Sequence, residues 1–273
     1  MKYEYAEEEY KIALERVKKE YEQKGTNNER PKLVFAAGQP ASGKSALPQK
    51  IIEDNPDIHF VVIDMDRYRM YHPRIQQIGE SNDDFVQATN AFSIRMEKDM
   101  LEHCLTNRDS FIHVGTMRIY EYLKEVVIDR AIEQGYEIEV YALAVPNIES
   151  KLSAISREDE QRKRRSKFVR KTSPSFIDEA DTGFKRSVEI MSDSPDISNL
   201  KILIRGKDAN SLPIIVYNQN TDRGKKYQNG YEALIATRKK QMNKNEIISE
   251  MEELAGIKKK ECNEQRGKDE IYR

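Results

Sequence analysis

The chain has 273 residues, of which 34% are charged and 38% are hydrophobic, and its formal net charge is −1. This length suits one large α/β domain with extra helices, or one and a half domains, and the apolar fraction is enough for one core. A nearly neutral chain has no overall attraction to nucleic acid or to a membrane surface, and no apolar run approaches the roughly 18 residues of a membrane-spanning helix.

Cysteine use and the N-terminal residues indicate the compartment. Cys104 and Cys262 lie far apart and show no metal-ligand spacing, which is typical of a protein from a reducing compartment. The first residues, MKYEYAEEEY, are acidic and lack the apolar stretch of a signal peptide. We therefore expect a cytoplasmic protein without a membrane partner.

Helix-like and strand-like segments alternate along the chain. Residues 1–24 carry apolar side chains at helical spacing, and the polar stretch 25–31 ends that helix. An apolar run at 33–37 predicts the first strand, and the helix predicted next covers 44–54. The further strands predicted are 58–63, 110–115, 136–145, 200–205 and 213–218, and the further helices are 83–107, 122–135, 147–165 and 176–191.

This alternation predicts an α/β fold, with a parallel sheet covered by helices on both faces. The continuous apolar strands support it, because strands of this kind are buried on both sides. From about residue 223, lysine and glutamate dominate, and YEALIATRKKQ and EIISEMEELAG have the pattern of surface helices. We predict three parts, namely an N-terminal helix (1–30), a main domain (31–222) and a charged helical C-terminal extension (223–273).

The segment VFAAGQPASGKSAL (34–47) fits the phosphate-loop pattern G-x-x-x-x-G-K-[ST] in full. Glycine lets such a loop approach a phosphate closely, and the loop amides and the start of the next helix then face its oxygens. The motif lies between an apolar strand and a helix, which is the context that it requires, whereas the alternative is a chance match in a turn. The predicted nucleotide-binding residues are Gly38, Gln39, Pro40, Ala41, Ser42, Gly43, Lys44, Ser45 and Ala46.

Two carboxylates follow the second predicted strand in VVIDMDRYRMYHP (61–73), namely Asp64 and Asp66. Open α/β sheets hold their sites at this edge, so one could be a general base while the other helps to order Mg²⁺. Because side chains alternate along a strand, we expect the two to point to opposite sides and only one to face the nucleotide. Alternatively, Asp64 caps the next helix and Asp66 is a surface residue.

The stretch RKRRSKFVRK (162–171) carries seven basic residues in ten. Arginines stabilise the charge of a phosphoryl-transfer transition state, and Arg157 and Arg170 are the candidates. The rest of the run is predicted to be a solvated helix face, because acidic residues at 158–160 offer partners one turn away. A nucleic-acid-binding patch is the alternative, and its affinity would fall steeply with salt.

Five segments, in this order, resemble the zeta toxin family of P-loop kinases. GQPASGKSAL resembles the family loop GQPGxGKT, and IDMDRYRMYHP resembles IDxDxFRxxHP. GTMR resembles EGTxR, while YALAVP followed by SKLSAISRED, and then RKTSP, resemble the regions of two lid arginines. The resemblance covers roughly residues 31–190 and implies that the main domain is a P-loop kinase domain.

The resemblance further implies an ATP- and Mg²⁺-dependent kinase of the 3′-hydroxyl of the sugar in UDP-N-acetylglucosamine, usually a toxin that an antitoxin protein neutralises. Carried over to this chain, Lys44 and Ser45 would bind ATP, and Ser45 would also bind Mg²⁺. Asp66 would be the catalytic base that contacts the acceptor. Arg157 and Arg170 would clamp the transferring phosphate.

The acceptor side departs from the family pattern. Thr116 and Arg118 match the residues that line the sugar-nucleotide pocket, but Val114 stands where the family usually has glutamate. A second glutamate of the family falls on or near Lys98, with Glu97 as a possible substitute. The leading hypothesis is a small-molecule kinase; the alternatives are a kinase of another nucleotide-type acceptor, such as a nicotinamide dinucleotide, a nucleotide-binding switch with little turnover, and a nucleic-acid-end kinase.

Overall fold

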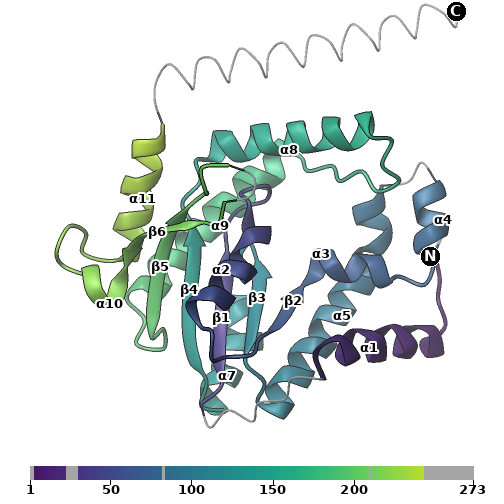
Figure 1. Ribbon diagram of the computed structural model, residues 1–273, viewed down its shortest axis with the longest axis horizontal. Coiled ribbons are helices and arrows are strands. Elements are labelled where there is room, and N and C mark those ends of the chain that lie inside the picture. The colour runs from purple at the N-terminus through teal and green to yellow at the C-terminus, as the bar shows by residue number, and fades with distance from the viewer. Residues whose placement is uncertain (1–2, 23–29, 82–83, 209–210, 243–273) are drawn as a thin grey trace, which may run out of the picture.

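The computed structural model describes residues 3–22, 30–81, 84–208 and 211–242. Within these residues, one sheet of six strands has the order β2-β3-β1-β4-β5-β6 (Figure 1). The pairs among β1 to β5 are all parallel, which confirms the predicted α/β fold. The strands are β1 (Lys32–Ala37), β2 (Val61–Asp64), β3 (Phe111–Gly115), β4 (Glu137–Leu143), β5 (Asn199–Ile204) and β6 (Ile214–Asn218).

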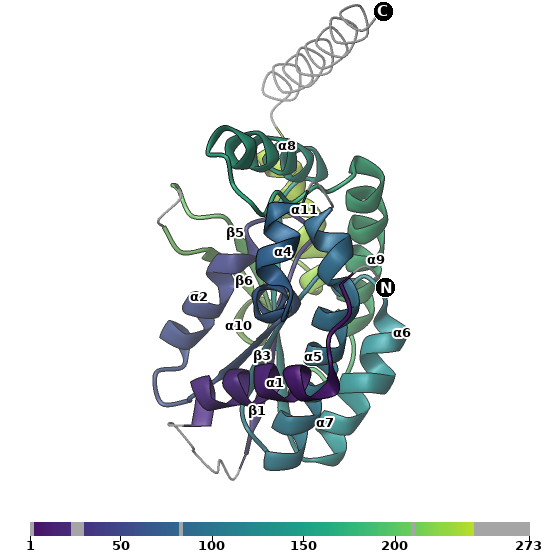
Figure 2. The same cartoon turned by 90° about the vertical axis from the view of Figure 1, so that its right-hand side faces the viewer.

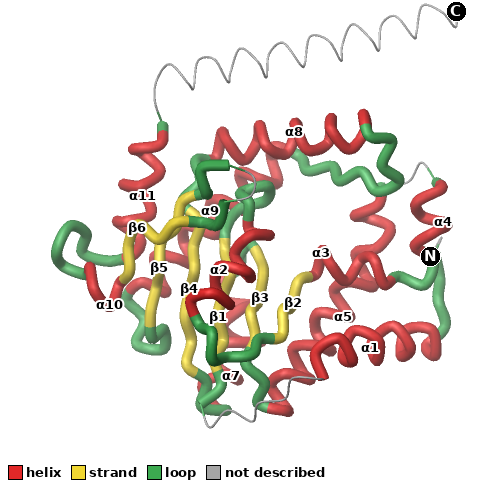
Figure 3. The backbone as a smooth tube through the Cα atoms, viewed as in Figure 1, coloured by secondary structure: helices red, strands yellow, loops and turns green. Residues whose placement is uncertain are grey.

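Helices surround this sheet on both faces and above the carboxyl ends of its strands (Figure 3). In the described part of the chain, none of them is both long and apolar enough to span a bilayer. Three short ones, α3, α4 and α10, were not predicted. The helices are α1 (Glu7–Glu22), α2 (Leu47–Asp54), α3 (Met65–Tyr68), α4 (Ile75–Glu80), α5 (Phe85–Asn107), α6 (Tyr120–Leu123), α7 (Asp129–Glu133), α8 (Asn147–Lys163), α9 (Pro174–Ser192), α10 (Gln219–Asp222) and α11 (Gly230–Gln241).

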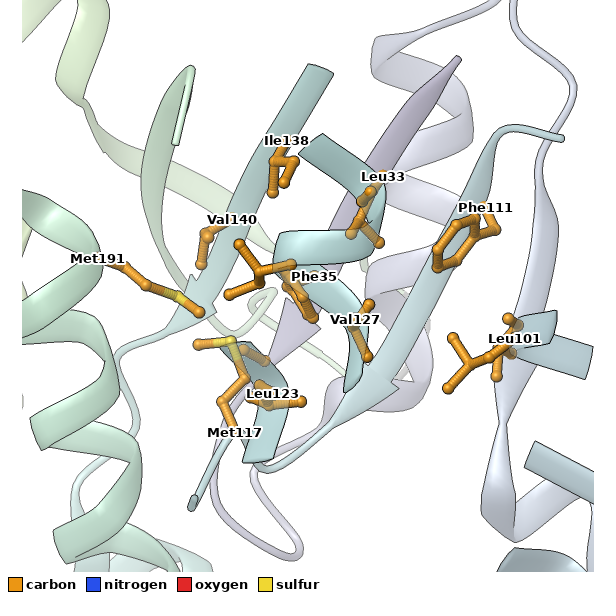
Figure 4. Close-up of a cluster of buried hydrophobic side chains, with 14 of the residues drawn as sticks. Leu33, Phe35, Leu101, Phe111, Met117, Leu123, Val127, Ile138, Val140 and Met191 are labelled. Carbon is orange, nitrogen blue, oxygen red and sulfur yellow. The ribbon is translucent and has the colours of Figure 1, made fainter. Parts of the chain in front are cut away.

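The core has one layer on each face of the sheet, and Figure 2 shows α2 on the opposite side from α6 and α9. On the α2 face, Leu47 and Ile51 pack against Val34 and Ala36 of β1. On the other face, the helices α5, α6, α7 and α9 cover the larger cluster, part of which is drawn in Figure 4. Because both faces are covered, most side chains of β1 to β5 are apolar.

Strand β6 pairs antiparallel with β5, so the sheet is not entirely parallel as predicted. Only residues 205–213 separate the two strands, and those among them that the structure describes, 205–208 and 211–213, contain no helix. A parallel return needs a crossover of a dozen or more residues, whereas a short connection reverses the chain. The length of this connection therefore determines the direction of β6.

Several predicted elements begin or end at other residues in the structure, and three of these differences are informative. Strand β2 begins at Val61 rather than at residue 58, because pairing with β3 starts there, although Phe60 is already buried. The helix predicted at 44–54 opens with a 3-10 turn, Lys44–Ala46, before α2. The helix predicted at 122–135 runs from α6 to α7 through a π-helical turn, Lys124–Ile128.

Helix α11 is not the surface helix that its charged sequence predicted. Ala233 and Leu234 are fully buried, and α11 packs against α9, β5 and β6. Its charged residues concentrate in the last turn, so that the average composition hides a buried face. The second helix predicted for the extension, EIISEMEELAG, lies outside the described residues.

Helix α1 is attached to the domain by its tyrosines and by ion pairs. Tyr10 is buried beside α5, and its hydroxyl donates to an Asp99 carboxylate oxygen at 2.6 Å. Val17 is buried in the same cluster. The ion pairs connect Glu7 with Arg95, Glu9 with Arg74, and Glu20 with Arg67.

A buried charge triad lies at the amino ends of three strands, opposite the phosphate loop. The Glu139 carboxylate of β4 accepts from Lys32 Nζ of β1 at 2.6 Å and from Lys201 Nζ of β5 at 2.9 Å. Lys201 also donates to the Tyr141 hydroxyl at 2.6 Å. Two cationic partners compensate the cost of burying the carboxylate.

Candidate functional site

The predicted phosphate loop connects the central strand β1 to α2. Its geometry favours glycine at two positions, Gly38 and Gly43. A Cβ atom on Gly38 would lie 2.7 Å from Ser42 Oγ and 3.3 Å from Leu143 Cβ. Gly43 has a φ of +93°, which is left-handed. Ala41 also has a positive φ, +58°, at a position where the family loop has glycine, and an L-residue pays about 1–2 kcal/mol there.

An arginine that the sequence did not single out holds this loop. Arg205, directly after β5, donates from Nε to the Ser42 carbonyl at 3.0 Å and from a terminal nitrogen to the Ala41 carbonyl at 2.7 Å. Its other terminal nitrogen donates to Ser153 Oγ of α8 at 3.0 Å. One planar guanidinium therefore ties the loop to both β5 and α8.

Lys44 lies at the centre of the site, whereas Ser45 is an exposed residue beside it. The Lys44 ammonium donates to the Gln39 carbonyl at 2.8 Å. Burial lowers the pKa of Lys44 to about 8, although the negative charges of Asp66 and Asp64 act in the opposite direction. Desolvation of this cation therefore outweighs the attraction of the two carboxylates.

Asp66 is held between two arginines. Arg69, itself buried, donates from Nε to Oδ1 at 3.1 Å, and Arg170 pairs with Oδ2. Burial alone would raise the pKa of Asp66, but the charges and hydrogen bonds of these arginines outweigh it and lower the pKa. Asp66 is thus an ionised carboxylate, and Arg69 fixes it to α5 through Thr89 Oγ1 at 3.1 Å.

Asp64 has the capping role that was the alternative interpretation. Its Oδ1 accepts from the Asp66 amide at 2.9 Å at the start of α3. Burial and the neighbouring charge of Asp66 raise its pKa. Strand alternation does not apply to the two carboxylates, since β2 ends at Asp64 and Asp66 belongs to α3. The negative charges of both act on Lys44.

The two predicted arginines come from α8 and from the α8–α9 connection. Arg157 donates to Thr172 Oγ1 at 3.0 Å, while its buried Nε has no hydrogen-bond partner among the described residues. Burial and the charge of Arg170 lower the pKa of Arg157. The structure therefore brings Lys44, Asp66, Arg157 and Arg170 into one electrostatically coupled group.

Phe168 docks the α8–α9 connection onto the opposite wall of the site. Its ring lies 5.1 Å from that of Phe85, measured between centroids. Gly79 of α4 leaves room for it, because a Cβ atom there would lie 2.7 Å from the Phe168 ring. This contact lies two residues before Arg170 in the same connection.

The remaining basic residues of this region form the solvated helix face that was predicted. They are exposed, and three of them pair with acidic residues one turn before them on α8, whereas Lys167 pairs with Glu80 of α4. The pairs are Arg162 with Glu158, Lys163 with Asp159, and Arg164 with Glu160.

The predicted acceptor residues lie on the segment after β3, which α9 holds. Thr116 is half-buried, and Ser187 Oγ of α9 donates to the carbonyl of the neighbouring Met117. Arg118 is exposed, pairs with Glu179 and lies over the Phe176 ring at 5.3 Å. Arg118 is thus directed toward α9, whereas the four residues above cluster around the phosphate loop.

The positions that depart from the family pattern are Val114 on β3 and residues 97 and 98 on α5, which packs on the opposite face of the sheet. Val114 is buried in the apolar layer beneath α2, where a carboxylate would be expensive. On the other face, Glu97 Oε1 of α5 lies 3.1 Å from His113 Nε2, while Lys98 is exposed. His113 belongs to no motif in the sequence. Because side chains alternate along a strand, its position next to Val114 indicates that it faces the other side of the sheet, toward α5.

Comparisons with known proteins assign the family and the fold of the chain. The family model of the zeta toxin matches residues 16–222. The toxin zeta of Enterococcus hirae is 30% identical over 133 residues, which are 47% of this chain and 45% of the relative. The toxin zeta of Streptococcus pyogenes gives the same identity and coverage. The chain therefore spans less than half the length of the curated relatives that it matches.

Two solved structures share the fold. A structure from the PezAT chromosomal toxin–antitoxin system of Streptococcus pneumoniae has a TM-score of 0.63 at 20% identity, covering 80% of this chain and 83% of that chain. The AvrRxo1-ORF1:-ORF2 complex has a TM-score of 0.53 at 14% identity, covering 78% of this chain and 68% of that chain. At these identities the likeness concerns the fold alone.

Proposed function

Because this chain belongs to the zeta toxin family, we propose that it is a phosphotransferase that uses ATP and Mg²⁺ to phosphorylate a hydroxyl group of a nucleotide-sugar-like acceptor. The observation that carries the proposal is the coupled group of Lys44, Asp66, Arg157 and Arg170 beside the phosphate loop. A kinase needs cations for the phosphates and a carboxylate for the acceptor hydroxyl, and this group supplies both.

The residues of the loop fit a polyphosphate. Lys44 and Arg157 are half-buried cations whose pKa values desolvation lowers, and Arg157 Nε is an unsatisfied donor among the described residues. A bound triphosphate would supply the missing negative charge and acceptor oxygens. Mg²⁺ would neutralise part of that phosphate charge, and the exposed hydroxyl of Ser45 is the group that would hold it.

Asp66 is the proposed base. It accepts the proton of the acceptor hydroxyl as the new O–P bond forms and the bond to the ADP leaving group breaks. Its low pKa keeps it ionised, and Arg69 holds Oδ1 in place. Oδ2 becomes free for the hydroxyl when Arg170 moves to the transferring phosphoryl group.

For the acceptor, we propose the sugar 3′-hydroxyl of UDP-N-acetylglucosamine, bound by Thr116 and Arg118. Glu97 supplies a carboxylate on the α5 side, although it is paired with His113. Val114 favours a second candidate, a different nucleotide-type acceptor such as a nicotinamide dinucleotide, because the usual glutamate is replaced by a buried apolar side chain. The toxin–antitoxin origin of the S. pneumoniae structure supports an antitoxin protein as a further proposed partner.

The test is phosphoryl transfer from Mg·ATP to a panel of nucleotide sugars, nicotinamide dinucleotides and nucleosides, with product mass as the readout. Lys44→Ala and Asp66→Asn should each lose the activity, the latter by about 10²–10⁴-fold. The matched control is Asp84→Asn, which makes the same chemical change at the N-cap of α5, where asparagine also caps.

Three outcomes distinguish the two proposed acceptors and a nucleotide-binding switch. A phosphorylated UDP-N-acetylglucosamine that both variants lose would establish the first acceptor, and transfer only to another nucleotide would establish the second. ATP binding without transfer to any acceptor would instead favour a nucleotide-binding switch. Normal transfer by Asp66→Asn would remove the assignment of the base.

A further inference from the structure

An arginine from α11 reaches the phosphate loop. Arg238 is only 7% exposed, and its guanidinium donates to Asp181 Oδ1 of α9 at 2.6 Å and to Gln39 Oε1 of the loop at 2.7 Å. Helix α11 lies beside β5, β6 and α9 (Figure 1) and begins after residue 222, where the family match ends. Arg238 therefore lies outside the part of the chain that the family model matches, whereas both of its partners lie inside it.

Gln39 connects this arginine to the functional lysine. Its side chain is fully buried and held at both ends, since Nε2 donates to the Val145 carbonyl at 2.7 Å while Oε1 accepts from Arg238. Its main-chain carbonyl accepts from Lys44 Nζ at 2.8 Å and from the Ser42 amide at 3.2 Å. The residue that supports Lys44 is thus itself fixed by α11.

A second contact links the end of α11 to the same region. Gln241 Nε2 donates to the Ala144 carbonyl, next to the carbonyl that Gln39 uses. Two side chains of α11 therefore reach the segment after β4 and the phosphate loop together. Apolar packing alone would not place two polar side chains of α11 in hydrogen bonds with the phosphate loop and the segment after β4.

We infer that Arg238 is a positioning residue of the nucleotide site, which holds Gln39 and through it the phosphate loop and Lys44 in the geometry that binds a nucleoside triphosphate. Helix α11 is then a required part of the site. This inference rests on the proposed nucleotide binding, so it is tested by binding rather than by turnover.

The experiment measures the affinity of the full chain for a non-hydrolysable ATP analogue with Mg²⁺, by calorimetry well below the unfolding temperature. Arg238→Met keeps the length of the side chain and removes both hydrogen bonds, and we expect the affinity to fall by about tenfold. Arg238→Lys keeps the charge beside Asp181 but cannot bridge two acceptors, so it should recover stability more than affinity. Leu234→Ala is the matched control, because it destabilises the same helix through its buried apolar face.

A double-mutant cycle with Gln39→Met separates positioning from general destabilisation. Arg238→Met should weaken binding in the wild-type background and add little once Gln39 is replaced. The inference is overturned if Arg238→Met and Leu234→Ala weaken binding equally, or if the effects of Arg238→Met and Gln39→Met simply multiply. If Arg238→Met does not fold, Arg238→Lys and Gln39→Met alone decide, and unchanged affinity in both overturns it. A wild-type chain that does not bind the analogue would instead refute the proposed function.

Discussion

Lys44 is a half-buried cation, and desolvation lowers its pKa to about 8 against the opposing charges of Asp66 and Asp64. A triphosphate would raise that pKa again, so binding should take up a proton when the pH is near or above 8. The protonated lysine binds, and affinity should therefore fall as the pH rises, by roughly tenfold between pH 7 and pH 9. The phosphates add no titration of their own in this range, since their second pKa is near 6.

Calorimetry at several pH values, in buffers of different ionisation enthalpy, measures both the affinity and the proton uptake. Lys44→Arg is the control, because a guanidinium stays protonated throughout this range and should abolish the uptake near pH 8. An affinity of the wild-type chain that stays constant from pH 7 to pH 9 would contradict the lowered pKa.

At the scale of residues, the sequence predicted the groups that belong to local motifs. Lys44, Asp66 and Arg170 each stand in a recognisable segment, and the structure brings them together. The sequence did not identify Arg205 or Arg238, because their roles depend on where β5 and α11 lie relative to the phosphate loop. No local spacing encodes that distance, and an isolated arginine in a charged helix is usually a surface residue.

At the scale of elements, the α8–α9 connection depends on one aromatic contact. Phe168 packs against Phe85 and over Gly79, and Arg170 follows it. We expect Phe168→Ala to lower the rate of transfer by about tenfold, because Arg170 loses its fixed position beside the phosphoryl group. Phe168 is only half-buried, so the loss of unfolding free energy should stay below the roughly 3–5 kcal/mol of a fully buried phenylalanine.

Steady-state kinetics and thermal unfolding of the same protein test this prediction. The control is Lys167→Ala, which removes an exposed ion pair with Glu80 from the same connection and leaves the ring in place. If both variants had the same rate, Phe168 would not position Arg170.

The sequence predicted the existence of elements better than their limits and directions. Apolar content marked 58–63 as a strand, yet Phe60 is buried without being part of β2, because burial and pairing are separate properties. The direction of β6 follows from the length of its connection. The buried face of α11 was hidden because its charged residues lie in one terminal turn.

At the scale of the whole molecule, α1 and α11 pack against the main domain with buried side chains. Helix α1 contributes buried Tyr10 and Val17, and α11 contributes buried Leu234 and Arg238. A fragment of residues 31–222, the predicted P-loop kinase domain, would expose the surfaces that these helices cover. We expect it to show no cooperative thermal transition, or one at a much lower temperature than the full chain.

Circular dichroism during heating measures this directly. A fragment of residues 3–242, which keeps both helices, should unfold at nearly the temperature of the full chain. A stable, cooperative 31–222 fragment would instead establish that the main domain folds independently of its two flanking helices.

The triad of Lys32, Glu139 and Lys201 has a fourth charged neighbour, because the more exposed Glu137 also pairs with Lys32 at 3.5 Å. Loss of either lysine leaves Glu139 with a cationic partner, whereas loss of Glu139 takes the carboxylate partner from the largely buried Lys201 and leaves Lys32 with Glu137. A single substitution can therefore replace one lysine during evolution, whereas Glu139 and its remaining lysine must be replaced together. We expect relatives to vary at positions 32 and 201 and to keep an acid at 139, and an alignment with the acid replaced beside two retained lysines would contradict this.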